Sequence, residues 1–225
     1  MKRFILFVFL LASVSGFSQK RKYSAFYDQR NSLFEVLPTS PKDVIFLGNS
    51  ITNGGEWTEL FGNKNMKNRG ISADTSEGVL DRLAPIVKGK PKKIFLLIGT
   101  NDIARKNPLN SVSTQTIDSI AQNIEKIVLE VKKASPKTKF YLQSILPVNA
   151  DFKMFNEHQQ PEAIKLLNQK IKQISEKHNV RYVDLYTHFV VENTDKLNPD
   201  YTNDGLHLTG EGYLLWARLI KPYLK

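Results

Sequence analysis

Cysteine is absent from this sequence of 225 residues. The chain therefore has no disulfide, no cysteine ligand for a metal and no cysteine to which a lipid is attached. Its fold must be stable through its core alone, and a chain of this length buries enough apolar surface for that. With 41% hydrophobic and 24% charged residues, the composition is typical of one globular domain.

Long apolar runs are also lacking. A membrane span takes about 20 apolar residues, whereas the run that begins at Phe4 ends near Ala12. Lys2 and Arg3 precede this run, and small residues follow it as far as Ser18. That order is typical of a secretory signal peptide, with a transmembrane anchor as the alternative. We predict that residues 1–18 are removed and that residues 19–225 form a secreted or periplasmic domain without a stable membrane anchor.

Acidic residues are outnumbered by basic ones, 22 against 32, which gives a formal net charge of +10. Such a balance suits nucleic acid or an anionic surface as a partner. The lysines, however, are spread among helix and turn segments, and no patch of basic residues interleaved with aromatic ones accompanies them. The charge therefore indicates a solvated basic surface, and we predict no nucleic-acid partner.

Apolar segments alternate with amphipathic ones along the rest of the chain. Five segments are predicted as strands: residues 43–48, 66–70, 92–99, 139–147 and 181–186. Helical patterns flank and separate them, at residues 24–38, 56–62, 76–87, 112–134, 161–178 and 210–224. Several of the strands are continuously apolar, as parallel strands buried on both faces usually are. The alternation predicts an α/β fold, a three-layer sandwich with a parallel sheet between two layers of helices.

Polar residues follow several of these strands at the points where ligands bind to an open parallel sheet, the carboxyl ends of its strands. Ser50 follows the first strand, Gly70 ends the second and Asn101 follows the third. Asp204 and His207 stand three residues apart, ahead of the last helix. We expect these residues to lie at one edge of the sheet, with the irregular residues 147–161 as a loop beside them.

The residue types in this set suit one kind of chemistry. A serine hydroxyl attacks a carbonyl when a base removes its proton, and His207 is a candidate base with Asp204 to orient its ring. The negative oxygen that then forms needs donors, for which the N–H groups of Ser50 and Gly70 and the amide of Asn101 are candidates. Each residue alone also has a purely structural interpretation, as a helix cap or a turn residue. Their combination in this order favours nucleophilic catalysis.

The histidines do not indicate a metal site. His158, His178 and His188 are not spaced as metal ligands usually are, either from one another or from nearby carboxylates. We therefore expect no metal, and the chemistry predicted for Ser50 needs no cofactor.

Four short blocks, GNSIT, NRGIS, GTND and DGLH, resemble those of the SGNH hydrolases, also called the GDSL esterase/lipase family. The four residues that name the family would be Ser50, Gly70, Asn101 and His207. The resemblance implies a flavodoxin-like, five-stranded parallel sheet with helices on both faces. It also implies that Ser50 is the nucleophile, His207 the base and Asp204 its orienting acid. Ser50, Gly70 and Asn101 would form the oxyanion hole.

Within that family, the segments SILPV and DLYTHF look most like the acetylhydrolase and sialate O-acetylesterase-like branch. This implies a serine esterase that removes O-acetyl groups from carbohydrate through an acyl-enzyme. A lysophospholipase or thioesterase on the same scaffold is one alternative, and a non-catalytic carbohydrate-binding protein is another. Asn49 departs from the family pattern, which has aspartate before the serine, so the hydrogen bonding of this turn is left open.

Overall fold

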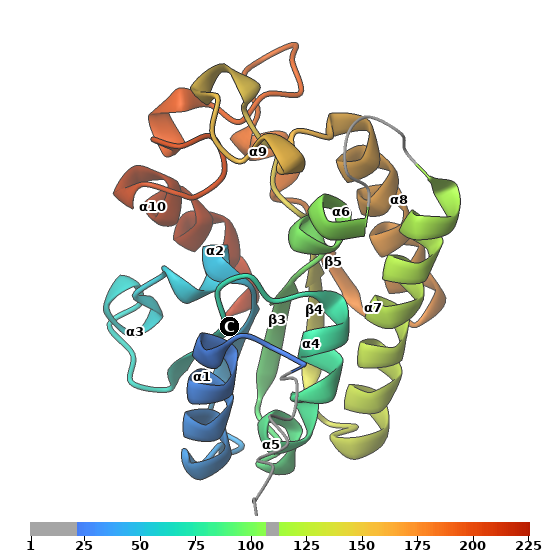
Figure 1. Ribbon diagram of the computed structural model, residues 1–225. Helices are drawn as coiled ribbons and strands as arrows, with labels where there is room; N and C mark the ends of the chain where they lie inside the picture. Colours follow the sequence, from blue (N-terminus) through green and yellow to red (C-terminus); the bar gives the residue numbers. More distant parts are fainter. Residues whose placement is uncertain (1–21, 107–112) are drawn as a thin grey trace, which may run out of the picture.

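The computed structural model describes residues 22–106 and 113–225 (Figure 1). The predicted signal peptide, residues 1–18, lies outside the described residues. Five parallel strands form one sheet in the order β2-β1-β3-β4-β5. They are β1 (Val44–Gly48), β2 (Met66–Gly70), β3 (Lys93–Leu97), β4 (Lys139–Gln143) and β5 (Arg181–Val183). The predicted five-stranded, flavodoxin-like sheet is confirmed.

Helices cover both faces of the sheet (Figure 1). In one layer, helices contact one another in a continuous series: α1 (Ala25–Val36), α4 (Ser76–Asp81), α5 (Leu83–Lys88), α7 (Thr114–Ala134) and α8 (Pro161–Lys177). The other layer consists of α3 (Trp57–Leu60) and α10 (Gly210–Ile220). The predicted three-layer sandwich is therefore confirmed. Among the helices of the described residues, none has the length and apolar character needed to cross a membrane.

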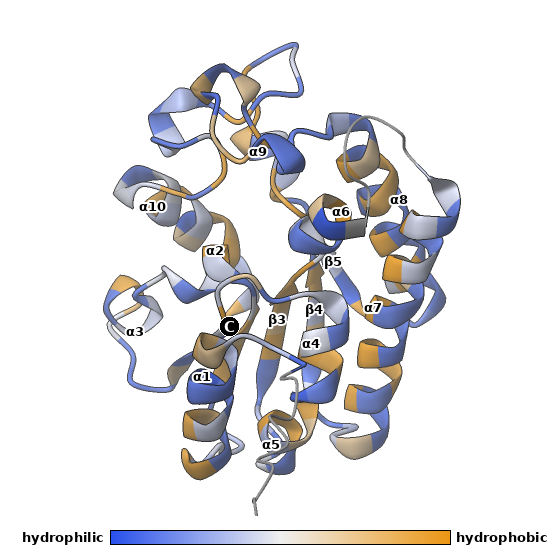
Figure 2. Cartoon of the chain, viewed as in Figure 1, coloured by the Kyte–Doolittle hydropathy of each residue, from blue (hydrophilic) through white to orange (hydrophobic). Residues whose placement is uncertain are grey.

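The two sides of the sheet are packed by different side chains. On one side, the ring of Phe46 in β1 stacks on Trp57 at a centroid distance of 3.9 Å, and Trp57 meets Trp216 of α10 edge to face at 4.8 Å. On the other side, α7 buries one apolar stripe that includes Ile117 and Ile124. Figure 2 shows hydrophobic and hydrophilic bands along this helix. Because both faces are covered, every residue of β1 and β3 is buried, as their almost wholly apolar sequences predicted.

One predicted helix differs from the structure. The pattern at residues 76–87 forms two helices, α4 and α5, which meet at Arg82. Pro85 explains the break, because it has no N–H to donate to the carbonyl of Asp81 and its ring crowds that carbonyl. Arg82 adopts φ −104° and ψ 15°, outside regular helix geometry.

The shorter elements lie mostly in the connections that follow the strands. They are α2 (Ser50–Asn53), α6 (Thr100–Lys106), α9 (Tyr186–Phe189), η1 (Ala150–Phe152), η2 (Asn156–His158), η3 (Pro199–Tyr201) and η4 (Lys221–Tyr223). The connection between β4 and α8 holds η1 and η2 and includes most of the stretch predicted to be irregular.

Candidate active site

Ser50 is placed by the turn that joins β1 to α2. β1 ends at Gly48, and Ser50 is the first residue of α2. The side-chain oxygen of Asn49 accepts the N–H of Ile51 at 3.0 Å and so caps this helix. Asn49 is only 1% exposed. An amide oxygen is thus sufficient for the cap, which accounts for asparagine at a position where the family usually has aspartate.

Ser50, His207 and Asp204 form one chain of hydrogen bonds. Ser50 Oγ lies 3.0 Å from His207 Nε2, across 157 residues of sequence. His207 Nδ1 lies 2.7 Å from Asp204 Oδ2. Because a carboxylate only accepts hydrogen bonds, the imidazole carries its proton on Nδ1 and turns its Nε2 lone pair towards the hydroxyl. His207 is therefore oriented to take the proton of Ser50.

The carboxylate of Asp204 is held by its neighbours. Oδ2 faces the ring of His207, while Oδ1 accepts the N–H groups of Leu206 at 2.9 Å and His207 at 2.8 Å. Burial alone would raise the pKa of the Asp204 carboxyl, but these hydrogen bonds outweigh burial and hold the pKa below its usual value. Gly205, at φ +84°, makes the tight turn that returns the backbone to this carboxylate. Asp204 thus stays ionised and stabilises a positive charge on His207.

The side chains reach a cavity of about 460 Å³ at the carboxyl ends of the strands. Its lining comes from several of the loops predicted to meet there, and from the irregular connection that precedes α8. The lining residues are Ser50, Ser72, Ala73, Asn101, Ala104, Arg105, Phe155, Glu157, His158, Leu206 and His207. The structure therefore brings Ser50, Asn101 and His207 together, as predicted.

Asn101 presents its amide to this cavity from the start of α6, directly after β3. Its Nδ2 donates one hydrogen to the carbonyl of Asp74 at 2.9 Å. Its Oδ1 lies 3.0 Å from Nε2 of His158. Within the described residues, the second Nδ2 hydrogen is left without a protein acceptor. The amide can therefore donate to a substrate oxygen in the cavity.

Gly70 corrects the sequence-based prediction. Its N–H donates to Oδ1 of Asn68 at 2.9 Å, and its carbonyl accepts from Asn53 at 3.2 Å. A Cβ at this position would lie 2.2 Å from the backbone nitrogen of Asn53, so glycine is required here by the close approach of α2. Gly70 does not line the cavity, and its N–H is already used. The prediction that it is an oxyanion donor is wrong on these contacts.

Ala73 lies three residues after Gly70 and has the features predicted for Gly70: a backbone at the cavity and an N–H available for a substrate oxygen. It lines the cavity and adopts a left-handed φ of +61°. Among the hydrogen bonds of residues 22–106 and 113–225, none uses the N–H of Ala73 or of Ser50. The carbonyl of Ala73 accepts from Arg105 at 2.7 Å. Sequence reasoning missed Ala73 because alanine carries no signal for a positive φ.

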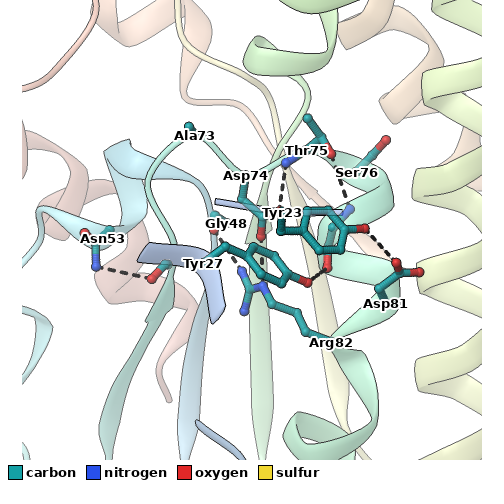
Figure 3. A network of polar contacts seen from close by, with 12 residues as sticks. Tyr23, Tyr27, Gly48, Asn53, Ala73, Asp74, Thr75, Ser76, Asp81 and Arg82 are labelled. Carbon is teal, nitrogen blue, oxygen red and sulfur yellow. Dashed lines mark hydrogen bonds and ion pairs between the residues drawn. The ribbon is translucent and has the colours of Figure 1, made fainter. Parts of the chain in front are cut away.

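A buried ion pair fixes the loop that carries Ala73. Arg82 Nε donates to Asp74 Oδ2 at 2.8 Å, and Arg82 Nη2 donates to the carbonyl of Gly48 at 3.1 Å (Figure 3). Both charged side chains are at most 1% exposed. The end of β1, just before Ser50, is therefore tied to the loop that faces it.

Replacement of Arg82 by methionine is expected to destabilise the fold by about 3–5 kcal/mol, because it leaves the Asp74 carboxylate buried without its cation. Urea unfolding followed by circular dichroism measures the change. Arg218→Met, in the last turn of α10, is the matched control and should shift the free energy of unfolding by less than about 1 kcal/mol. An Arg82→Met variant as stable as the parent would show that the pair does not hold this loop.

Metal ligands are not gathered at this site. In the described part of the chain, no three histidine, aspartate or glutamate side chains are grouped as a metal would require.

Comparison with known proteins agrees with this geometry. The profile of the GDSL-like lipase/acylhydrolase family matches residues 46–215. Platelet-activating factor acetylhydrolase IB subunit alpha2 of Homo sapiens is 29% identical over 191 residues, which cover 80% of this chain and 73% of that protein. A GDSL-like lipase structure from Bacteroides thetaiotaomicron is 31% identical with a TM-score of 0.72, covering 88% of this chain and 96% of that one. An acetylxylan esterase from Geobacillus stearothermophilus shares the fold at 20% identity, with a TM-score of 0.64 and coverage of 82% and 94%.

Proposed function

This chain belongs to the GDSL-like lipase/acylhydrolase family and is a carboxylic ester hydrolase, and within that activity we propose that it removes acetyl groups from carbohydrate. The observation that supports ester hydrolysis is the hydrogen-bonded chain from Ser50 through His207 to Asp204, open to the cavity. Acyl transfer needs an activated hydroxyl beside N–H groups that can donate to the substrate oxygen.

In the proposed mechanism, Ser50 Oγ attacks the carbonyl carbon of the ester while His207 Nε2 takes the hydroxyl proton. The negative oxygen is bound by the N–H groups of Ser50 and Ala73 and by the amide of Asn101. His207 then gives its proton to the leaving alcohol, and the acyl group stays on Ser50. A water that loses a proton to His207 attacks this ester; the bond to Oγ breaks, the acid is released and His207 returns the proton to Ser50 Oγ. Asp204 stabilises the imidazolium in both halves.

The acetyl preference rests on the lining of the cavity and on the relatives. Ala73, Ala104 and Leu206 supply small or medium apolar surface, which suits a short acyl group. Arg105 and Glu157 are exposed beside them and provide charged groups for the hydroxyls of a sugar. The names of two of the similar proteins, an acetylhydrolase and an acetylxylan esterase, point the same way. Lysophospholipids and thioesters are the alternative substrates, and the panel of esters described next tests them as well.

A panel of esters distinguishes these substrates. The purified protein is assayed with acetylated xylooligosaccharide, 4-nitrophenyl acetate and octanoate, acetyl-CoA and lysophosphatidylcholine. We expect the acetylated sugar to give the highest kcat/KM and the octanoate at least about tenfold less than the acetate, since a short pocket gains nothing from extra methylenes. Faster hydrolysis of lysophosphatidylcholine or acetyl-CoA than of the sugar ester would refute the carbohydrate proposal while leaving the esterase intact.

We also propose that the protein acts outside the cytoplasm, as a domain of residues 19–225 after removal of residues 1–18. Support comes from the N-terminal sequence alone. Extracytoplasmic glycans are accessible to such a protein, whereas thioester substrates are mostly intracellular. N-terminal sequencing of the protein recovered from the periplasm or medium should begin at Gln19. A cell-bound form that retains Met1 would contradict this proposal.

Asn101→Ala is expected to lower kcat for 4-nitrophenyl acetate by about 10²–10³-fold, because one donor to the negative oxygen is lost. KM should change little, since this hydrogen bond strengthens as the charge develops. Steady-state kinetics with the folded, purified variant measures kcat and KM. A loss below about tenfold would remove Asn101 from the oxyanion hole.

The acid side of the pH profile should report one proton. Protonated His207 cannot accept the proton of Ser50, so activity falls as the pH decreases. Asp204 does not contribute there, because its pKa lies below its usual value and it remains ionised. A plot of log kcat/KM against pH is therefore expected to rise with a slope of one. A slope approaching two would mean that a second group must lose a proton and would contradict the assignment.

A further inference from the structure

His158 is a buried histidine that contacts the side chain of Asn101. It ends the short helix η2, in the irregular connection before α8, and is 8% exposed. Its Nε2 lies 3.0 Å from Oδ1 of Asn101, although the two residues are 57 positions apart. His158 also lines the cavity with Ser50 and His207. It thus touches the candidate oxyanion donor directly.

The partners of the amide fix which end of Asn101 faces which way. The carbonyl of Asp74 only accepts, so the amide nitrogen of Asn101 must lie on that side. The amide oxygen then faces His158, and His158 Nε2 must be the donor in that contact. Both polar atoms of the amide are therefore held, Nδ2 by Asp74 and Oδ1 by His158. The orientation of the amide in turn fixes the direction of the second hydrogen on Nδ2.

The surroundings of His158 keep this donor in place. Burial lowers the pKa of His158, against an opposing effect of the Glu157 carboxylate, and the charge of His207 lowers it further. His158 Nδ1 has no hydrogen bond within the described residues, while Glu157 Oε1 stands 3.4 Å away. The ring of Phe155 meets both His158 and His207 edge to face, at centroid distances of 5.9 and 5.1 Å. His158 is thus packed in one orientation with its hydrogen on Nε2.

We propose that His158 is a positioning residue that keeps the amide of Asn101 turned with an N–H towards the developing negative oxygen. Without the imidazole donor, only the hydrogen bond to the carbonyl of Asp74 holds the amide, and the second N–H loses its fixed direction towards that negative charge. The inference rests on the proposed oxyanion role of Asn101. It assigns to His158 no contact with the reacting atoms, because its Nε2 hydrogen is used by Asn101.

His158→Leu removes the hydrogen-bond donor and fills the buried position with an apolar side chain instead. We expect kcat for 4-nitrophenyl acetate to fall by about 10–100-fold with KM unchanged, less than in Asn101→Ala because a fraction of the amides keeps the productive orientation. His158→Gln offers an amide N–H at a similar reach and should restore kcat to within about fivefold of the parent. A side chain that only filled space would show no such rescue by a polar residue.

A double-mutant cycle with Asn101→Ala tests the coupling. If His158 acts through Asn101, then His158→Leu should change kcat of the Asn101→Ala enzyme by less than about twofold. If the two losses multiply, His158 acts elsewhere and the inference is overturned. Full activity of His158→Leu overturns it as well.

Two further readouts separate other causes of a loss. If Asn101→Ala alone costs less than tenfold in kcat, the proposed oxyanion role of Asn101 fails, and this result is distinct from a failure of the cycle. Urea midpoints of all variants show whether each is folded at the assay temperature. Should His158→Leu not fold, His158→Met takes its place in the same cycle, with the same expected coupling and the same contradicting result.

Discussion

Ser50→Ala is expected to lower kcat for 4-nitrophenyl acetate by at least about 10⁴-fold, because removal of Oγ leaves only the oxyanion donors and substrate binding to assist water. The fold should be unaffected, since the helix that begins at residue 50 is capped by Asn49 and not by the hydroxyl. Steady-state kinetics and the urea midpoint measure the two effects together.

The matched control for this variant is Ser32→Ala. Ser32 lies in α1, and its hydroxyl donates only to the carbonyl of Gln29 on the exposed face of that helix. Its kcat should equal that of the parent. If Ser50→Ala kept more than about 1% of the parent kcat, the nucleophile would have to be another group, since the residual catalysis of such sites is far smaller.

Asp204→Asn is expected to lower kcat by about 10⁴-fold through the tautomer of His207. The new amide oxygen can still accept the N–H groups of Leu206 and His207, so the loop keeps its shape. The amide nitrogen then faces Nδ1 of His207 and donates to it. The imidazole hydrogen moves to Nε2, where it points at Ser50, and the ring can no longer take a proton from the hydroxyl.

Asp200→Asn is the control for that substitution. Asp200 is exposed in η3, four residues before Asp204, and is not among the residues that line the cavity. It should retain the parent kcat. A loss of less than about tenfold in Asp204→Asn, with the fold intact, would mean that the carboxylate does not set the state of His207.

The sheet and its helices could be predicted because their physical signals are local. The strands β1 and β3 are apolar at nearly every position, and the structure buries them on both faces. The division of the helix predicted at residues 76–87 has a local cause as well, since Pro85 ends α4 at a position that the apolar pattern alone does not mark.

The candidate site could be predicted only in part. The position of Ser50 follows from the end of β1, and that of His207 from its place just ahead of the last helix and from its spacing to Asp204. The backbone donor does not follow from such signals. Glycine permits close approach, which favours Gly70 in the sequence, yet its N–H is bound to Asn68 and its lack of a side chain serves the packing of α2. Within the part of the chain that the structure describes, the N–H of Ala73 makes no hydrogen bond, and the positive φ of this residue is set by tertiary structure.

His158 lay beyond sequence reasoning for a different reason. It stands in an irregular connection without periodicity, and its contact with Asn101 joins residues 57 positions apart. The spacing of histidines in a sequence can indicate a metal site. It cannot indicate that the fold places the amide of Asn101 beside the ring of His158.

The central claim is that His207 activates Ser50 as a nucleophile that becomes acylated. The most direct test is to treat the protein with a fluorophosphonate, which modifies activated serines, and to map the adduct by peptide mass spectrometry. The account predicts a single adduct, on Ser50, that forms at least about 10²-fold more slowly in His207→Ala. An adduct on another residue, or none while the untreated protein hydrolyses 4-nitrophenyl acetate, would contradict it.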